Sequence, residues 1–178
     1  MGERPSEFVR DPHDWYVEPS WSVEILRDLV PFRGAIHDPC CGMGTIPHVF
    51  RGTGADLVDR GYGFPVRDFL TDRSGYQNIV FNPPYGIAQE VIEHAREHAE
   101  ERVAALVQTK FLASQRRYPL FSGFDTELVI MLSRRPSMPP GVMLREHGEA
   151  IRGGGSLDFC WVIWKRGHNA GARIVWAK

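Results

Sequence analysis

The sequence has only three cysteines, and it has neither a long apolar run nor an excess of charge of one sign. Cys40 and Cys41 are adjacent while Cys160 is distant, so the spacing excludes a disulfide framework, and we expect a reducing, cytoplasmic location. No apolar run approaches the roughly 18 residues of a membrane-spanning helix, so we expect no membrane association. The polar N-terminus carries acidic residues, which does not match a signal peptide.

Lysine is also scarce, because almost all of the positive charge is carried by arginine. The formal net charge of −1 does not indicate a strongly basic nucleic-acid binder. Arginine does suit phosphate recognition, since its planar guanidinium bonds oxygen atoms in pairs. A GC-rich genome would give the same composition, so composition alone leaves the partner open.

The order of segments predicts one α/β domain. A chain of 178 residues is long enough for a single domain with its own core. Strand-like and helical segments alternate through the first two thirds, which is typical of a parallel sheet, and two final strands without a helix between them predict an antiparallel hairpin. Residues 1–19 are predicted to form an N-terminal arm, and residues 134–158 a long loop within the hairpin. We expect helices at 20–29, 46–51, 87–102 and 111–121, and strands at 35–37, 54–58, 66–70, 78–81, 102–107, 126–132 and 159–165.

A glycine-rich segment follows the first predicted strand, and it reads Asp38-Pro39-Cys40-Cys41-Gly42-Met43-Gly44-Thr45. Ligands of open α/β sheets bind at the carboxyl ends of strands. Two glycines would let the backbone pass close beneath a ligand, and a helix that begins just afterwards would offer backbone N–H groups. The third glycine of a dinucleotide fingerprint is missing, which disfavours a nicotinamide cofactor.

Two further acids follow at the ends of the next predicted strands. Asp59 lies 21 positions after Asp38, at the distance where a carboxylate meets the hydroxyls of a ribose in such folds. Asp68 stands beside Phe69, and a carboxylate next to an aromatic ring can hold and stack an adenine ring. Each of these residues could also be an ordinary solvated residue at the end of a strand, so they indicate a binding site only when taken together.

The sharpest motif is Asn82-Pro83-Pro84-Tyr85, which lies between an apolar strand and a long helix. Two prolines stiffen the turn and remove two N–H donors. The turn therefore presents two acceptors, the side-chain oxygen of Asn82 and the carbonyl of Pro83, with the ring of Tyr85 beside them. Two acceptors that bind both hydrogens of a planar amine draw the nitrogen toward a tetrahedral shape and free its lone pair for attack. The motif thus predicts a binding site for an amine conjugated to an aromatic ring.

Together the two motifs resemble those of the amino-methyltransferases of the Rossmann-like, class I methyltransferase type, and the resemblance covers roughly residues 15–132. It implies a mostly parallel seven-stranded sheet with helices on both faces, an antiparallel C-terminal hairpin, and S-adenosylmethionine as the cofactor, with S-adenosylhomocysteine as product. The segment Trp15–Pro19 is similar to a Tyr-x-Thr-Pro segment that closes over the cofactor, with Glu18 in place of threonine. Site residues implied for the cofactor are Tyr16, Asp38, Pro39, Cys40, Gly42, Gly44, Thr45, Asp59, Asp68, Phe69 and Asn82, and those implied for the target amine are Asn82, Pro83, Pro84 and Tyr85.

The resemblance implies adenine N6 as the target, with DNA favoured over RNA. Adenine in ribosomal or other RNA and the amide of a protein glutamine remain alternatives, because each presents a planar NH₂ group. A catalytically inactive cofactor-binding module is the alternative from another class. DNA enzymes of this type usually carry a target-recognition domain, so we expect low specificity or a partner that supplies recognition. The sequence indicates no oligomeric state.

No metal site is predicted. His37, Cys40, Cys41 and His48 lie close together in the sequence but lack the paired spacing of zinc ligands. We expect His94 and His98 to lie on a solvated side of their helix. In the reaction that the resemblance implies, the sulfonium already makes the methyl group electrophilic, so catalysis depends on positioning of the reactants.

Overall fold

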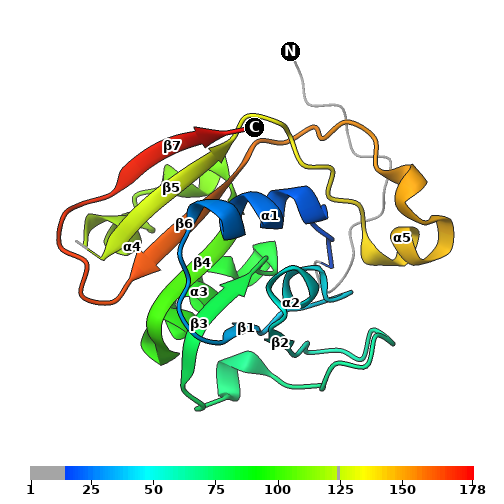
Figure 1. Ribbon diagram of the computed structural model, residues 1–178, viewed down its shortest axis with the longest axis horizontal. Helices are drawn as coiled ribbons and strands as arrows, with labels where there is room; N and C mark the ends of the chain where they lie inside the picture. Colours follow the sequence, from blue (N-terminus) through cyan, green and yellow to red (C-terminus); the bar gives the residue numbers. More distant parts are fainter. Residues whose placement is uncertain (1–14, 124) are drawn as a thin grey trace.

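A mixed seven-stranded sheet forms the centre of the computed structural model, which describes residues 15–123 and 125–178 (Figure 1). Its strand order is β2-β1-β3-β4-β6-β5-β7; β6 runs antiparallel to β4 and β5, and every other pairing is parallel. The predicted fold class is confirmed. The strands are β1 (Ile36–Asp38), β2 (Thr53–Gly54), β3 (Tyr76–Phe81), β4 (Ala99–Gln108), β5 (Thr126–Leu132), β6 (Phe159–Lys165) and β7 (Arg173–Ala177).

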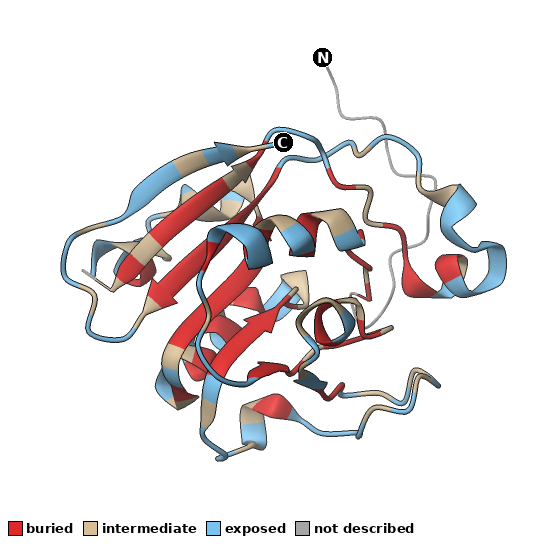
Figure 2. Cartoon of the chain, viewed as in Figure 1, coloured by how far each residue is buried: buried red, intermediate tan, exposed pale blue. Residues whose placement is uncertain are grey.

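Helices cover both faces of this sheet, because its central strands are apolar on both sides. In β6, Cys160, Val162 and Trp164 pack on one face, and the alternate residues Phe159, Trp161 and Ile163 pack on the other. The red core in Figure 2 runs through the middle strands. The first face packs against α3 (Ala88–His98) and α4 (Tyr118–Ser122), and the second against α1 (Ser20–Leu29) and α2 (Thr45–Phe50).

Several predicted boundaries were wrong. The helix predicted at 87–102 ends at His98, because the next residues pair with β3 as the start of β4, and sheet pairing outweighs their helical propensity. In place of the predicted strand 54–58, the structure has only the short strand β2. The predicted strand 66–70 is a single bridge at Val66, followed by the 3₁₀ helix η1 (Phe69–Thr71). The seventh strand of the sheet is instead β7, which was not predicted. The helix predicted at 111–121 is η3 (Thr109–Leu112) and the short α4.

The predicted loop 134–158 contains α5 (Gly141–His147) and η4 (Glu149–Ile151), and it holds the N-terminal strap, residues 15–18. The amide of Gly141 donates to the carbonyl of Trp15 at 2.9 Å, and the amide of Val17 donates to the carbonyl of Pro139 at 3.1 Å. A side chain at Gly141 would collide with the ring of Trp15. The strap is therefore not a free arm, while residues 1–14 of the predicted arm lie outside the described residues. Within the described segments, no helix is long and apolar enough to cross a membrane.

Candidate active site

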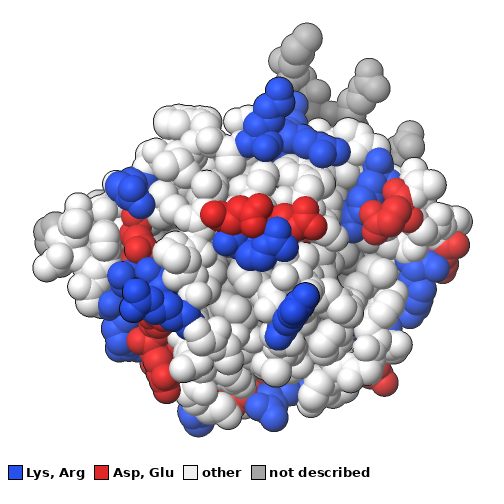
Figure 3. All heavy atoms as spheres, viewed as in Figure 1, with Lys and Arg blue, Asp and Glu red and all other residues white. Residues whose placement is uncertain are grey.

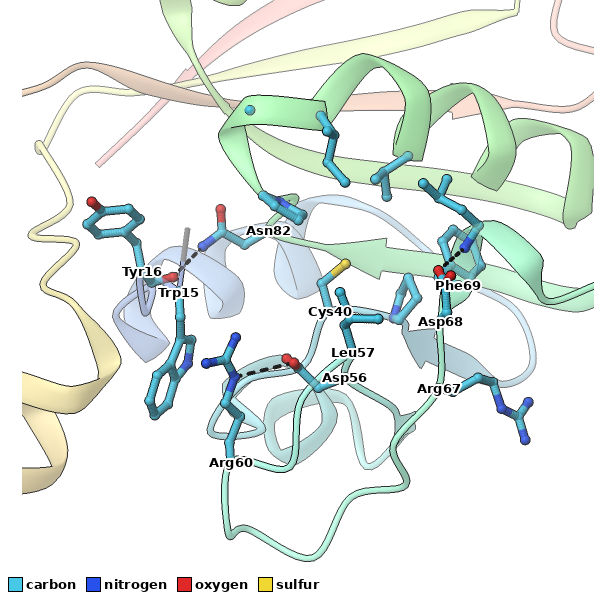
Figure 4. A pocket seen from close by; sticks show the side chains of 16 residues that line it. Trp15, Tyr16, Cys40, Asp56, Leu57, Arg60, Arg67, Asp68, Phe69 and Asn82 are labelled. Atoms are coloured by element: carbon cyan, nitrogen blue, oxygen red, sulfur yellow. Dashed lines mark hydrogen bonds and ion pairs between the residues drawn. The ribbon is translucent and has the colours of Figure 1, made fainter. Parts of the chain in front are cut away.

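A cavity of about 630 Å³ lies beyond the carboxyl ends of β1, β2 and β3 (Figure 4). This is the edge at which open α/β sheets bind ligands, and the volume is within the range that holds a small organic molecule. The strap, the glycine-rich segment, the residues after β2 and the Asn-Pro-Pro-Tyr turn all contribute to its walls. Predicted site residues that line it are Tyr16, Pro39, Cys40, Asp68, Phe69, Asn82 and Pro84.

The glycine-rich segment turns sharply between β1 and α2. Gly42 and Gly44 have φ angles of 53° and 85°, in the left-handed region that side chains rarely adopt. A Cβ on Gly42 would lie 2.6 Å from Nε1 of Trp15, so only glycine lets the strap approach this closely. Asp38 caps the turn by accepting a hydrogen bond from the amide of Cys40 at 2.9 Å. Asp38, Gly42, Gly44 and Thr45 thus shape the loop without lining the cavity themselves.

The acid that follows β2 into the cavity wall is Asp56, and the placement predicted for Asp59 was wrong. β2 ends at Gly54, and Asp56 then pairs with Val66 in an isolated bridge. Asp56 is 8% exposed and lines the cavity, whereas Asp59 is exposed and only accepts a bond from the amide of Gly61. Sequence reasoning missed Asp56 because it extended the strand through Val58.

Asp56 lines the cavity and contacts the glycine-rich segment directly and the strap through Arg60. Its carboxylate accepts hydrogen bonds from the amides of Gly42 (2.9 Å) and Val58 (3.0 Å) and from Nε of Arg60 (3.3 Å). The guanidinium of Arg60 in turn lies 4.5 Å from the centroid of the Trp15 ring. A carboxylate can accept about four hydrogen bonds, so Asp56 retains capacity for one more donor from a ligand in the cavity.

Two more acids are buried next to this region. Asp38 is 1% exposed and Glu18 is 6% exposed. Burial raises the pKa of Glu18 above its ordinary value, and burial together with the charge of Glu18 raises the pKa of Asp38 well above its ordinary value. The clustered carboxyls disfavour one another as anions. A cation bound here would relieve that repulsion, so the site is suited to a ligand with a positive group.

The Asn-Pro-Pro-Tyr turn presents an unused acceptor. Nδ2 of Asn82 donates to the carbonyl of Tyr16 at 2.8 Å and to Oε2 of Glu18 at 3.0 Å. Because both neighbours accept, the amide nitrogen faces them and Oδ1 points the other way. That Oδ1 atom is buried and has no hydrogen-bond partner within the described part of the chain. A buried acceptor without a partner costs free energy, which a donor on a bound ligand would recover.

Aromatic side chains flank this acceptor. The rings of Tyr85 and Tyr16 stack with centroids 5.5 Å apart and an interplanar angle of 14°. Tyr85 and Pro83 do not line the cavity itself, whereas Asn82 and Pro84 do. At the far end, Asp68 accepts a bond from the amide of Leu70 at 3.0 Å, and Phe69 is largely buried against His94. Asp68 and Asn82 thus stand at opposite sides of the same cavity (Figure 4).

Residues 15–123 and 125–178 contain two other sets of reactive groups, the thiol of Cys40 at the cavity and a cluster on α3. Burial and the nearby charge of Asp38 raise the pKa of the Cys40 thiol well above its ordinary value, so it remains a neutral thiol rather than a nucleophile. The side chains of His94, Glu97 and His98 have ligand atoms within 4.8 Å of one another. His94 is buried, contrary to the solvated position that we expected. The centroids of the two imidazole rings lie 4.1 Å apart, and Nε2 of His94 and Nδ1 of His98 each lie 2.9 Å from a backbone carbonyl, that of Asp72 and that of His94.

No family model matches the chain, and no curated protein matches it in sequence. Solved structures do match it. A Listeria monocytogenes protein assigned to the class I S-adenosylmethionine-dependent methyltransferases aligns with a TM-score of 0.63 at 10% identity, over 96% of this chain and 68% of that one. The M protein of the type I restriction enzyme EcoKI aligns with a TM-score of 0.59 at 10% identity, over 94% of this chain. Magnesium protoporphyrin IX methyltransferase from Synechocystis, solved with bound S-adenosylmethionine, aligns at 0.52 and 14% identity, over 83% of this chain and 79% of that one.

These similarities show the fold, which is that of the class I methyltransferases. The sheet order with its antiparallel C-terminal pair and the cavity at the carboxyl ends of β1 to β3 agree with that class. The chain spans 50% of the length of the EcoKI M protein, so that protein contains additional sequence with no counterpart here.

Proposed function

We propose that this chain is an S-adenosylmethionine-dependent methyltransferase that acts on an exocyclic amino nitrogen, with N6 of adenine in DNA as the target. The observation that carries the proposal is Oδ1 of Asn82, a buried acceptor at the cavity that has no partner within the described residues. A dehydrogenase has no use for such an acceptor in this place, and an inactive binding module would gain nothing from leaving it without a partner.

The residues around the cavity suit the cofactor. The glycine-rich segment would hold the methionine end, where buried Asp38 favours its ammonium group. Asp56, in place of Asp59, would accept from the ribose hydroxyls, and Asp68 with Phe69 would flank the adenine. When bound, S-adenosylmethionine supplies a methyl group made electrophilic by its sulfonium.

The protein's contribution to transfer is positioning. Oδ1 of Asn82 and the carbonyl of Pro83 would accept the two hydrogens of the target amine and stabilise the positive charge that develops on its nitrogen. Tyr85 would leave its stack on Tyr16 or share it with the target ring. No general base is needed before transfer, because the proton leaves after the nitrogen has become cationic. A base in duplex DNA must be flipped out of the helix to reach this site.

DNA is favoured because one structural neighbour is the M protein of a restriction enzyme. Surface charge does not add to this argument, since basic and acidic side chains are both scattered over the face in Figure 3. RNA adenine and protein glutamine remain the alternatives. A recognition domain or subunit outside the described fold would then supply sequence specificity.

The experiment measures transfer of a labelled methyl group to duplex DNA, single-stranded DNA, ribosomal RNA and glutamine-containing peptides in parallel. We expect label in DNA, recovered as N6-methyladenine after digestion. Label found only in RNA or peptide would support methyl transfer to an amino nitrogen but would show that the substrate is not DNA. Calorimetry with S-adenosylmethionine serves as the independent control, and the absence of binding at high cofactor concentration would refute the proposal.

Cofactor binding should release protons. The pKa of Asp38 is raised in the free protein, and a cationic ligand beside it favours the ionised carboxylate, so the pKa falls on binding. Affinity for the cofactor should therefore increase as the pH rises toward the pKa that Asp38 has in the free protein, and it should level off above that pKa. Calorimetry in buffers of different ionisation enthalpy measures this release, and Asp38→Asn should reduce it. Proton uptake on binding would contradict this account.

A further inference from the structure

Glu18 is an unusual residue to find in the strap. Its side chain is 6% exposed, and burying a carboxylate is costly unless it is hydrogen-bonded. Its carboxyl accepts hydrogen bonds from its own backbone amide, from Nδ2 of Asn82 at 3.0 Å and from the side chain of Thr45, with the charge of Arg152 nearby. The strap would be fastened without it, through the backbone bonds of Trp15 and Val17 to residues 139–141. The carboxyl is therefore not required to hold the strap.

We propose that Glu18 is a positioning residue that orients the Asn82 amide for the target amine, which rests on the proposed methyltransferase function. The carbonyl of Tyr16 takes one hydrogen of the Asn82 NH₂ group, and Glu18 takes the other. With both hydrogens used, Oδ1 is the only amide atom of Asn82, a residue of the cavity wall, that is left for a donor on the substrate. A hydrogen bond to a carboxylate also polarises the amide, which makes Oδ1 a stronger acceptor as charge develops on the target nitrogen.

The same contact determines which residue position 82 can hold. Aspartate at position 82 would place a second carboxyl against Glu18, about where the 3.0 Å hydrogen bond now lies. Like charges at this distance destabilise each other in a buried site. With glutamine at position 18, an aspartate at position 82 would be accommodated, because the amide N–H groups of the glutamine can donate to it. The two positions are therefore a donor and acceptor pair whose roles can be exchanged for this one bond, although the carbonyl of Tyr16 then loses its donor.

The test compares four proteins: the unchanged chain, Glu18→Gln, Asn82→Asp, and the double variant. Cofactor Kd, kcat and KM are measured for each with the substrate identified by the methyl-transfer panel. We expect kcat to fall about 10-fold to 100-fold in Glu18→Gln and at least about 100-fold in Asn82→Asp. The double variant should recover kcat at least about 10-fold over Asn82→Asp, because the pair is restored with its roles exchanged. Glu24→Gln, at an exposed position of α1, is the matched control and should stay within about twofold.

Three results would overturn the proposal. Unchanged kcat in Glu18→Gln would show that the carboxylate does not act on Asn82 during transfer. A folded double variant no more active than Asn82→Asp would show that the pair is not coupled. A Kd for S-adenosylmethionine that rises about 10-fold in Glu18→Gln at unchanged kcat would make Glu18 a cofactor ligand instead.

Thermal unfolding separates this proposal from the proposed function. Asn82→Asp should lower Tm by about 3 °C or more, and adding Glu18→Gln should restore part of that loss, whether or not methyl transfer is detected. Restored Tm without methyl transfer by the unchanged protein would refute the function and leave only a structural pair. Methyl transfer with additive Tm changes would refute the pairing and leave the function in place.

Discussion

Replacing Asn82 with alanine should reduce methyl transfer by at least about 100-fold to 1,000-fold, the usual cost of removing one preorganised polar group from a transition state. The reason is the loss of Oδ1, the buried acceptor proposed to hold the target amine. Cofactor affinity should change only a few-fold, because the strap remains bonded to residues 139–141. Single-turnover transfer measures the first effect and calorimetry the second.

Gln89→Ala provides the matched control for this substitution. It also removes a side-chain amide, but one on α3 that donates to Glu93 at 2.9 Å and does not line the cavity. Its transfer rate should equal that of the unchanged protein within about twofold. Substantial transfer by Asn82→Ala would contradict the proposed mechanism, and loss of cofactor binding in that variant would give Asn82 a role in holding the strap instead.

Asp56→Asn should weaken the binding of S-adenosylmethionine by about 10-fold to 100-fold, whereas Asp59→Asn should leave it within about twofold. Asp56 lines the cavity, and its negative charge accepts from the amide of Gly42 at 2.9 Å. An asparagine has one acceptor oxygen, so it loses either that bond or the one proposed to the ribose. Asp59 is exposed, and an asparagine there can still accept from Gly61.

Calorimetric titration of both variants decides between the two acids, and thermal unfolding without cofactor shows how far Asp56→Asn disturbs the loop itself. Equal affinity in the two variants would remove Asp56 from the cofactor site. A larger effect from Asp59→Asn would restore the residue that the sequence favours and would require the loop after β2 to rearrange on binding.

The fold class was predictable because its signals are local. The alternation of apolar segments with α1 and α3 indicates a parallel α/β sheet. The antiparallel pairing of β5 with β6 was also predicted correctly, but from the expectation that no helix separates them, whereas α5 lies between them in the chain. Strand β7 was missed, although the run Ile174-Val175-Trp176 carries a usable β signal. Helix α5 was missed because the proline and glycine residues around it predict a loop, while its burial of Leu144 depends on Trp15.

The motifs that form the cavity could be predicted from the sequence, but most contacts between the residues of its walls could not. The glycine-rich segment and the Asn-Pro-Pro-Tyr turn each follow a strand, so both come to one edge of the sheet. The position of Asp56 depends on where β2 stops pairing, and its partners Pro65 and Arg67 lie across a loop that periodicity does not reveal. The contact between Glu18 and Asn82 joins residues 64 positions apart, so no local spacing indicates it.

The strap has a consequence for the order in which the molecule assembles. Its contacts join residues very distant in sequence: Arg152 donates to the carbonyl of Val17 across 135 positions, and Asn82 donates to that of Tyr16 across 66. Closing such long loops costs chain entropy before any contact is gained, so these contacts form late in folding. Local opening then begins where stabilising contacts are few and distant. We therefore expect the strap to form late in folding and to open early, and a cofactor bound against it would keep it closed.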